Sequence, residues 1–288
     1  MYEFEYAAPT TVAEAVRLLG EADARPLAGG TDLIAQMKEG RRKPRRIVDL
    51  KRIPELTAVT TANGHVRIGA AASISAVAAN SVVRERYPAV VEASQLIGSF
   101  QIQNRASIGG NVCNAAPSAD AVPALLVSGA RGLIVGPNGE REIDLPALFK
   151  GPGQTTLGPG ELLAAVLLPP VAERSAAKYL RFIPRAEMDI AVAGAGAWIR
   201  LDANGTIAEA RLALASVAPT PIRAPEAEAA LVGQKPATNL LTEAGRLAAR
   251  AARPISDTRG SKEYRIELVK VLTERALQGC LEQLGITA

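Results

Sequence analysis

Cysteine and histidine are almost absent from this chain. Its 288 residues include two cysteines, Cys113 and Cys280, and one histidine, His65. A structural zinc site or an iron–sulfur cluster needs several such ligands at close spacing, so neither can be built from this sequence alone. One histidine also leaves no credible Ser-His-Asp triad and no His-based metal site. We expect no metal ligands and no catalytic acid or base here, and two isolated cysteines favour a reducing compartment.

Aromatic residues and long apolar runs are also scarce. Aromatic side chains make up 3% of the residues, too few for a platform that stacks single-stranded nucleic acid. No apolar stretch reaches the roughly 18 residues that span a bilayer, and the N-terminal residues are acidic where a signal peptide is basic. The net charge is +4, and the basic run 41–46 is interpreted as a solvated loop. These features predict a soluble cytoplasmic protein without a nucleic-acid partner.

Two glycine pairs stand out among the residues that are present. Residues 28–32 (AGGTD, the first glycine motif) follow a predicted strand and precede a predicted helix. Residues 107–111 (SIGGN, the second glycine motif) have a similar composition. Glycine allows close backbone approach and positive φ, and successive main-chain N–H groups bind an anion without any basic side chain. Two such turns suit a pyrophosphate, which indicates a dinucleotide, although neither fits the Rossmann or P-loop pattern.

The chain divides into three predicted parts. Residues 1–55 alternate helix and strand signals, including a capping box at Thr11 and Glu14. Residues 56–170 contain hairpin signals at Asn63-Gly64 and around residues 137–140, and end at a Pro-Pro pair. Residues 171–288 begin with three predicted strands and end with three predicted helices. The fold class is therefore α+β.

Residues 97–120 carry the most specific signal. Together with residues 26–33, 151–153, 158–162, 189–191 and 257–260, this segment resembles the FAD-binding medium subunit of molybdenum hydroxylases. That family includes the carbon monoxide dehydrogenase medium chain and the flavin domain of xanthine dehydrogenase. The resemblance implies a two-part FAD-binding domain of the vanillyl-alcohol-oxidase/PCMH type. It also implies a C-terminal three-stranded antiparallel sheet with a helical bundle.

The same resemblance implies the cofactor site. Both glycine motifs would bind the pyrophosphate of noncovalent FAD, Asp120 would bind a hydroxyl-bearing part of it, and Ile97 and Ile190 would lie near its rings. A core role is the alternative for both isoleucines. The predicted cofactor-binding residues are Ala28, Gly29, Gly30, Thr31, Asp32, Ile97, Ser107, Ile108, Gly109, Gly110, Asn111, Asp120 and Ile190.

The resemblance further implies a role in electron transfer. The flavin would receive electrons from a small 2Fe–2S subunit, which a large molybdopterin subunit supplies, and would pass them to an external acceptor. A dimer of heterotrimers is the expected assembly. Two other functions remain open: a stand-alone flavin oxidase or reductase of the same fold, and a non-redox nucleotide-binding assembly module. The substrate and the final acceptor are not encoded in these residues.

Overall fold

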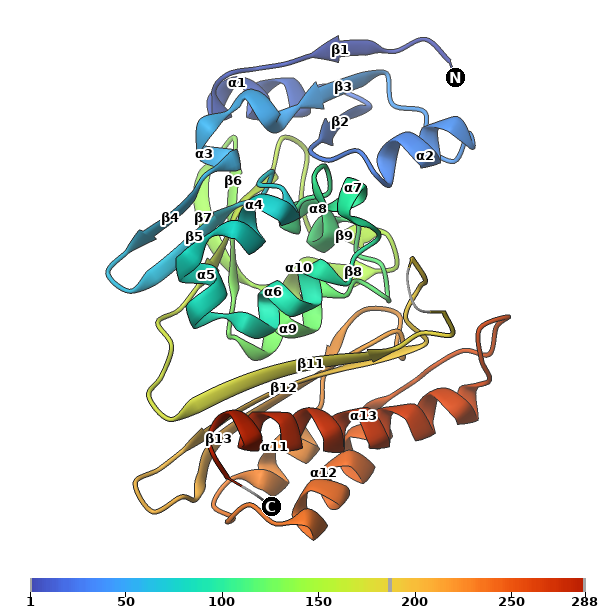
Figure 1. Ribbon diagram of the computed structural model, residues 1–288. Coiled ribbons are helices and arrows are strands. Elements are labelled where there is room, and N and C mark those ends of the chain that lie inside the picture. Colours follow the sequence, from blue (N-terminus) through green and yellow to red (C-terminus); the bar gives the residue numbers. More distant parts are fainter. Residues whose placement is uncertain (1, 186–187, 287–288) are drawn as a thin grey trace.

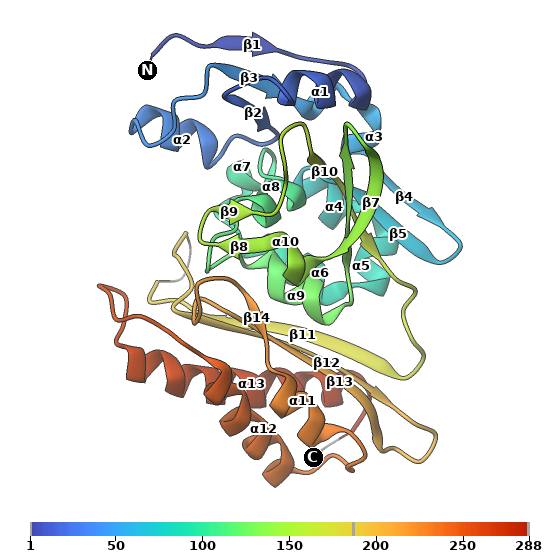
Figure 2. The same cartoon turned by 180° about the vertical axis from the view of Figure 1, so that it is seen from behind.

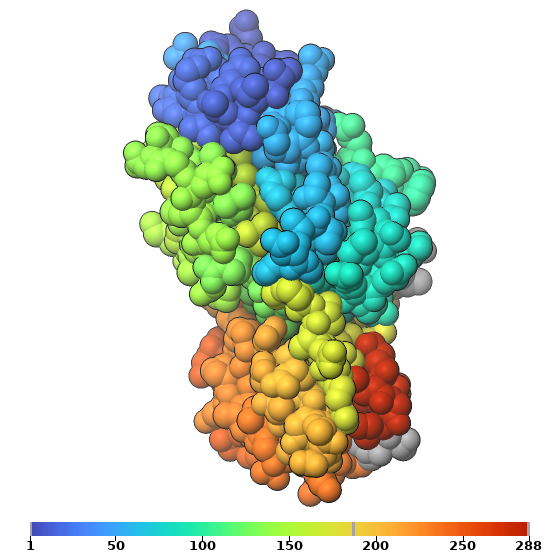
Figure 3. All heavy atoms as spheres, turned by 90° about the vertical axis from the view of Figure 1, so that its left-hand side faces the viewer, coloured from blue at the N-terminus to red at the C-terminus, as the bar shows by residue number. Residues whose placement is uncertain are grey.

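The chain folds into three tiers, each built around its own sheet. The computed structural model describes residues 2–185 and 188–286. Figure 1 shows the N-terminal tier at the top and the C-terminal tier at the bottom, with the middle tier between them. The space-filling view in Figure 3 shows that the stacked tiers give an elongated molecule. No helix among the described residues is long and apolar enough to cross a membrane.

The N-terminal tier is a small parallel sheet with the strand order β1-β3-β2 (Glu5–Ala7, Arg46–Asp49 and Ala24–Leu27). Helix α1 (Val12–Leu19) begins as the sequence predicts, because the Thr11 hydroxyl accepts a hydrogen bond from the Glu14 N–H at 3.3 Å. Helix α2 (Leu33–Lys38) follows the first glycine motif. The strand, glycine turn and helix thus occur in the predicted order.

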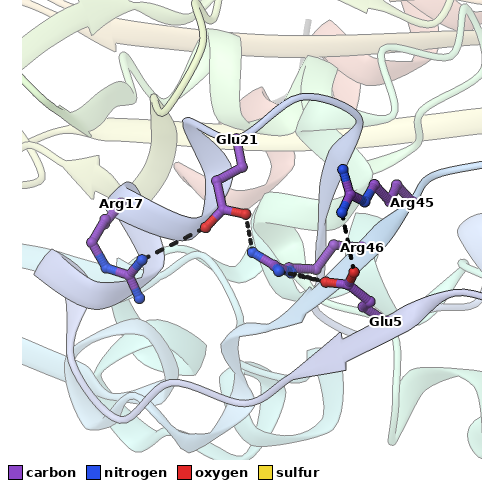
Figure 4. A network of polar contacts seen from close by, with 5 residues as sticks. All are labelled: Glu5, Arg17, Glu21, Arg45 and Arg46. Carbon is purple, nitrogen blue, oxygen red and sulfur yellow. Dashed lines mark hydrogen bonds and ion pairs between the residues drawn. The ribbon is translucent and has the colours of Figure 1, made fainter.

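An ionic network holds the edges of this tier together. Arg46 in β3 lies between Glu5 of β1 and Glu21 after α1, and forms ion pairs with both (Figure 4). Arg45 approaches Glu5 and Arg17 approaches Glu21, each at 3.6 Å. Hydrogen bonding to Arg46 holds the pKa of Glu5 below its usual value. The network therefore connects β1, the C-terminal end of α1 and β3.

The middle tier is an antiparallel sheet with the order β4-β5-β10-β6-β7. Both predicted hairpins are confirmed: β4 and β5 turn at Asn63-Gly64, where both residues have positive φ, and β6 and β7 turn at residues 137–138. The central strand β10 comes from much later in the chain than its neighbour β5. The strand bounds are β4 Val59–Ala62, β5 His65–Gly69, β6 Arg131–Gly136, β7 Gly139–Asp144 and β10 Leu162–Leu168.

Short helices fill the middle tier beside this sheet. Helix α9 (Ala121–Val127) is apolar and is buried along its whole length. A small hairpin, β8 (Phe149–Gly151) and β9 (Gln154–Thr155), is best seen from behind in Figure 2. The remaining elements are η1 Leu50–Arg52, α3 Pro54–Thr57, α4 Ile74–Ala79, α5 Ser81–Arg86, α6 Pro88–Gln95, α7 Phe100–Gln103, α8 Ile108–Cys113 and α10 Leu145–Leu148.

The C-terminal tier is an antiparallel sheet packed between two sets of helices (Figure 1). The three predicted strands form β11 (Ser175–Phe182), β12 (Ala193–Leu201) and β13 (Ile207–Ala215), and the structure adds a two-residue edge strand, β14 (Ile222–Arg223). Side chains alternate between the two faces of a strand. One face therefore packs on α9, and the other packs on the three C-terminal helices. These are α11 Pro225–Leu231, α12 Thr238–Ala251 and α13 Lys262–Gln283.

Several polar contacts fix the C-terminal tier to the middle tier. The Tyr87 hydroxyl donates to the Pro169 carbonyl, and Lys178 pairs with Glu92 at 2.9 Å. Arg211 of β13 stacks 4.1 Å above the centre of the Trp198 ring and donates across the boundary to the Val127 carbonyl of α9 at 3.1 Å. The boundary between the two tiers is therefore a packed seam.

Candidate functional site

The first glycine motif presents four consecutive unpaired N–H groups. Within the part of the chain that the structure describes, the N–H groups of Gly29, Gly30, Thr31 and Asp32 have no hydrogen-bond acceptor. Gly30 has φ +77°, a conformation that glycine adopts without steric cost. Asp32 makes no side-chain cap to α2. Successive free N–H groups of this kind form a concave anion-binding surface.

The second glycine motif differs from the turn that the sequence predicts. Gly109 and Gly110 lie in the first turn of α8, and Ser107 caps that helix by accepting from the Gly110 N–H at 3.0 Å. The N–H groups of Gly109 and Asn111 bond to the carbonyls of Ala70 and Ser107, both at 3.0 Å. The expected free N–H groups are therefore already used at these three residues, at Gly110 and Asn111 by the start of the helix and at Gly109 by a tertiary contact.

Polar side chains remain available in the second motif. The Asn111 Oδ1 atom is buried and has no partner among the described residues. Ser107 is buried as well, and its hydroxyl accepts one hydrogen bond while its own proton stays free to donate. A buried amide without a partner is costly unless something satisfies it. The motif therefore has a hydroxyl donor and an unsatisfied amide-oxygen acceptor, in place of a row of N–H groups.

The two motifs lie side by side because their glycines permit close packing. A Cβ on Gly29 would lie 2.1 Å from the Arg105 carbonyl oxygen, directly before the second motif. A Cβ on Gly109 would lie 2.5 Å from the Ala70 carbonyl oxygen. No side chain fits at either distance, so these glycines are required for the fold as well as for any ligand.

A cavity of about 230 Å³ opens between the two motifs. Pockets that bury drug-sized ligands occupy about 300–1,000 Å³, so this cavity would enclose part of a dinucleotide and leave the rest along the surface. The structure brings most of the predicted residues to its lining: Ala28, Gly29, Gly30, Thr31, Asp32, Ile97, Ser107, Gly109, Gly110 and Asn111. Three predicted residues, Ile108, Asp120 and Ile190, lie outside it.

Asp120 lies at the seam between the middle and C-terminal tiers. Its carboxylate accepts from the Tyr179 hydroxyl at 2.8 Å and from Arg181 Nη1 at 2.5 Å, both on β11. Burial raises the pKa of Asp120 to about 6, although Arg181 and Tyr179 favour its ionised form. Arg181 Nε is buried without a partner among the described residues. The sequence patterns did not identify Tyr179 or Arg181 as site residues. The only signal was the charge of Arg181, which lies between two large apolar residues of a strand.

The other two predicted residues occupy different environments. Ile108 is fully buried beneath the second motif, where its side chain packs in the core. Ile190 is 48% exposed in the loop between β11 and β12, next to Asp189, whose carboxylate accepts from the Ile190 N–H at 2.8 Å. The Ile108 side chain therefore anchors the second motif in the core and does not line the cavity. Ile190 presents an exposed apolar surface.

Charged and sulfur-containing side chains complete the cavity wall. Arg25 and Arg42 lie at its edge, and Arg42 Nη2 donates to the Gly153 carbonyl at 3.5 Å, which links the N-terminal tier to the β8–β9 hairpin. Burial raises the pKa of Asp32. Burial also raises the pKa of the Cys113 thiol to about 12, so that this thiol stays protonated near neutral pH. The two arginines place positive charge in the cavity lining.

Other features of the described residues do not compete with this site. A larger cavity of about 440 Å³ lies at the seam beside Trp198 and Arg211, but it contains none of the predicted residues. No group of three or more His, Cys, Asp or Glu side chains within residues 2–185 and 188–286 is placed to hold a metal ion. His65 lies in β5, away from both glycine motifs.

This site has the chemistry that a dinucleotide diphosphate requires. It combines a run of free N–H groups, the free proton of the Ser107 hydroxyl, and two arginines in the cavity lining. A family model described as the FAD binding domain in molybdopterin dehydrogenase matches residues 2–171, and one described as the CO dehydrogenase flavoprotein C-terminal domain matches residues 178–280. The chain belongs to this molybdopterin-dehydrogenase flavoprotein family. It is an oxidoreductase subunit, and its cofactor is FAD.

Individual relatives of this flavoprotein agree over nearly the whole chain. The xanthine dehydrogenase FAD-binding subunit of Escherichia coli O157:H7 is 34% identical over 289 residues, 99% of each chain. The carbon monoxide dehydrogenase medium chain of Hydrogenophaga pseudoflava is 32% identical over 276 residues, 95% of this chain and 96% of that one. A solved structure of carbon monoxide dehydrogenase from the same organism matches with a TM-score of 0.94 over 98% of both chains, at 32% identity. The expected α+β flavoprotein fold is confirmed.

Proposed function

We propose that this chain is the FAD-carrying electron-transfer subunit of a heteromeric molybdenum hydroxylase. In that role it would receive electrons from a 2Fe–2S partner and pass them to an external acceptor. The observation that carries the proposal is the cavity between the two glycine motifs, with four unpaired N–H groups on one side and Ser107 and Asn111 on the other. When bound, FAD supplies the redox chemistry itself, and the protein supplies position and electrostatics.

The residues of this chain would hold the cofactor by its diphosphate. The N–H groups of residues 29–32 and the Thr31 hydroxyl would donate from the first motif. The Ser107 hydroxyl and the Nδ2 group of Asn111 would donate from the second motif, and the closely packed glycines would keep the two sides at a fixed separation. The backbone donors need no reorganisation on binding, because each is held by the turn and helix around it.

Residues outside the cavity would contact the remainder of the cofactor. Asp120 already accepts one hydrogen bond on each oxygen, and each oxygen keeps a further lone pair for a hydroxyl group. Ile97 lines the cavity, and the exposed Ile190 would cover part of a ring. On this reading residues 1–55 and 56–170 form the FAD-binding parts, and residues 171–288 form a separate C-terminal domain.

The partners follow from the same proposal. Relatives of this chain are named medium chains of carbon monoxide dehydrogenase and of glyceraldehyde dehydrogenase, names that imply further chains. We infer a small 2Fe–2S subunit and a large molybdopterin subunit, arranged as a dimer of heterotrimers. A cytoplasmic location fits Cys113 and Cys280, which are both unpaired in the structure, because free thiols persist in reducing compartments.

Purified protein tests the proposal directly. We expect stoichiometric, noncovalent FAD and a yellow protein. The variant Thr31→Val keeps the side-chain shape but loses the hydroxyl, and we expect its FAD affinity to fall by about tenfold or more, as for a hydrogen bond to a charged group. Thr61→Val, on the exposed part of β4, is the matched control.

Co-expression then tests the partners. The chain should co-purify with a molybdopterin-type chain and a cysteine-rich chain encoded beside it, and its flavin should be reduced by substrate only in that complex. Reduction of the isolated chain by a small organic substrate would instead identify a stand-alone flavin enzyme. Protein that binds no flavin at all would support a non-redox module and overturn the proposal.

A further inference from the structure

Lys51 reaches the first glycine motif from behind the cavity. Its ammonium donates to the Ala28 carbonyl at 3.0 Å and to Asp49 Oδ1 at 2.7 Å. Lys51 lies in η1, and its side chain is 26% exposed. It does not line the cavity. Lys51 therefore contacts the motif through a main-chain carbonyl and from outside the lining of the cavity.

The geometry of a peptide unit gives this contact a consequence. The Ala28 carbonyl and the Gly29 N–H belong to one trans peptide, in which the two groups point in opposite directions. Because Lys51 fixes the carbonyl on one side, the Gly29 N–H is directed to the other side. There it has no acceptor within the described residues, and Ala28, Gly29 and Gly30 face the cavity.

Lys51 is itself held by a short chain of hydrogen bonds. Asp49 is buried and accepts from both the Lys51 ammonium and the Lys51 N–H, the latter at 3.0 Å, as well as from the Tyr6 hydroxyl at 2.6 Å. Burial acts to raise the pKa of Asp49, but the hydrogen bonds from Lys51 and Tyr6 outweigh it, so the pKa is lowered. Asp49 is thus ionised near neutral pH and keeps the ammonium in place.

We propose that Lys51 is a positioning residue for the FAD diphosphate: it orients the peptide between Ala28 and Gly29 so that the first N–H group of the motif points at the phosphate. Its positive charge on the carbonyl end also polarises that peptide toward a stronger donor. Tyr6 and Asp49 support Lys51 in this task. The inference rests on the proposed binding of FAD between the two glycine motifs.

Binding titrations of the apoprotein test this role without any assay of activity. Lys51→Met keeps the length of the side chain and removes the ammonium. We expect its dissociation constants for FAD and for ADP, which share the diphosphate, to rise by the same factor, on the order of 10- to 100-fold, as when groups that orient the ligands of a site are removed. Lys51→Arg keeps a donor and a charge and should recover most of the loss.

Two further variants separate positioning from other effects. Lys43→Met makes the same charge change on the exposed loop after α2 and should leave both affinities within about twofold. Tyr6→Phe removes only the hydroxyl at the far end of the chain of hydrogen bonds, on a side chain that is 58% exposed, and should weaken FAD and ADP a few-fold. It provides the test if Lys51→Met does not fold.

These titrations distinguish failure of the role proposed for Lys51 from failure of the proposed function. If the wild-type protein does not bind FAD, the proposed function is wrong. If the wild type binds FAD but Lys51→Met binds FAD and ADP as tightly, or loses no more affinity than Lys43→Met, the role of Lys51 is overturned. An unequal loss, large for FAD and absent for ADP, would also overturn it, because the effect would then lie at the flavin end.

Discussion

Gly29 lies against the main chain of Arg105, at a place where a Cβ would be 2.1 Å from the Arg105 carbonyl oxygen. The contact joins the first glycine motif to the residues directly before the second. The N-terminal and middle tiers thus meet through backbone atoms, which cannot rearrange as a side chain can. The contact between Gly29 and Arg105 therefore sets the width of the cavity between the two motifs.

Gly29→Ala should therefore destabilise the protein as well as weaken FAD binding. The added methyl group must push residues 28–32 away from residues 105–107, at a cost toward the upper end of the roughly 1–3 kcal/mol typical of overpacking. Gly151→Ala, where a Cβ meets nothing within 4 Å, is the control. Urea denaturation of both apoproteins measures the difference. Equal stability of the two variants would contradict the close packing at Gly29.

The buried carboxyl of Asp120 should give the protein a pH-dependent stability. Its pKa is about 6 in the folded protein and 3.8 in the unfolded chain, so the folded state binds more protons between these values. The stabilising contribution is complete below pH 3.8 and is lost as the pH rises through 6. A difference of about two pH units corresponds to roughly 3 kcal/mol.

Asp120→Asn removes this titration while keeping the size of the side chain. Between pH 4 and pH 7 we expect the free energy of unfolding of the wild-type apoprotein to fall relative to that of the variant. Urea midpoints at several pH values give the comparison. A wild type that gains stability over the variant as the pH rises would show that Arg181 and Tyr179 outweigh burial at this site.

The Arg46 network should stabilise the N-terminal tier in a manner that depends on salt and pH. Arg46 lowers the pKa of Glu5, so the contribution is present above the unfolded pKa of Glu5 and is lost as the pH falls through the lower folded value. Arg46→Met should increase hydrogen exchange in residues 24–38 at low salt, and 1 M salt should reduce its difference from the wild type. Arg17→Met, which removes only one exposed ion pair, should have a smaller effect. A salt-independent effect of Arg46→Met would point to packing instead.

Tryptophan fluorescence reports on the seam between the middle and C-terminal tiers, because Trp198 lies at this seam and is the only tryptophan in the sequence. Arg211 covers its ring and donates to the Val127 carbonyl at 3.1 Å. Arg211→Met should cost about 1–3 kcal/mol and change the tryptophan emission, because it removes a cation–π contact and a charged hydrogen bond. Arg200→Met loses an ion pair with Glu209 on the same sheet. It should change the free energy of unfolding and the tryptophan emission far less. Emission identical to the wild type in Arg211→Met would contradict the stacked geometry.

Local sequence signals predicted most of the fold. Hairpins with glycine at positive φ, the Thr11 cap and the long C-terminal helices depend on neighbouring residues, and all lie where the sequence places them. The order of the middle sheet depends on contacts between distant residues, and no local pattern indicates that β10 lies between β5 and β6. Helix α8 was missed because two adjacent glycines disfavour helix, and Ser107 and the packing of Gly109 on Ala70 compensate for them.

The candidate site was predictable to a similar extent. Glycine pairs next to polar residues indicated the cavity lining, because glycine lets the backbone approach a ligand closely. The contacts that support the first glycine motif and Asp120 were not predictable, since Lys51, Tyr6, Tyr179 and Arg181 act across tiers or strands. Which N–H groups are free also depends on tertiary contacts, as the bond from Gly109 to Ala70 illustrates.

The central place of β10 has a consequence for biosynthesis. Residues 5–49 can complete their own sheet soon after they leave the ribosome, whereas the sheet beside the second glycine motif lacks its middle strand until residue 168 has emerged. At a synthesis rate of about 5–20 residues per second, β5 and β6 wait several seconds for β10. During this time each of them has one unpaired edge. Capture of the flavin nucleotide is thus a late event in the maturation of this polypeptide, and a ribosomal pause before residue 168 would prolong the exposure of those edges.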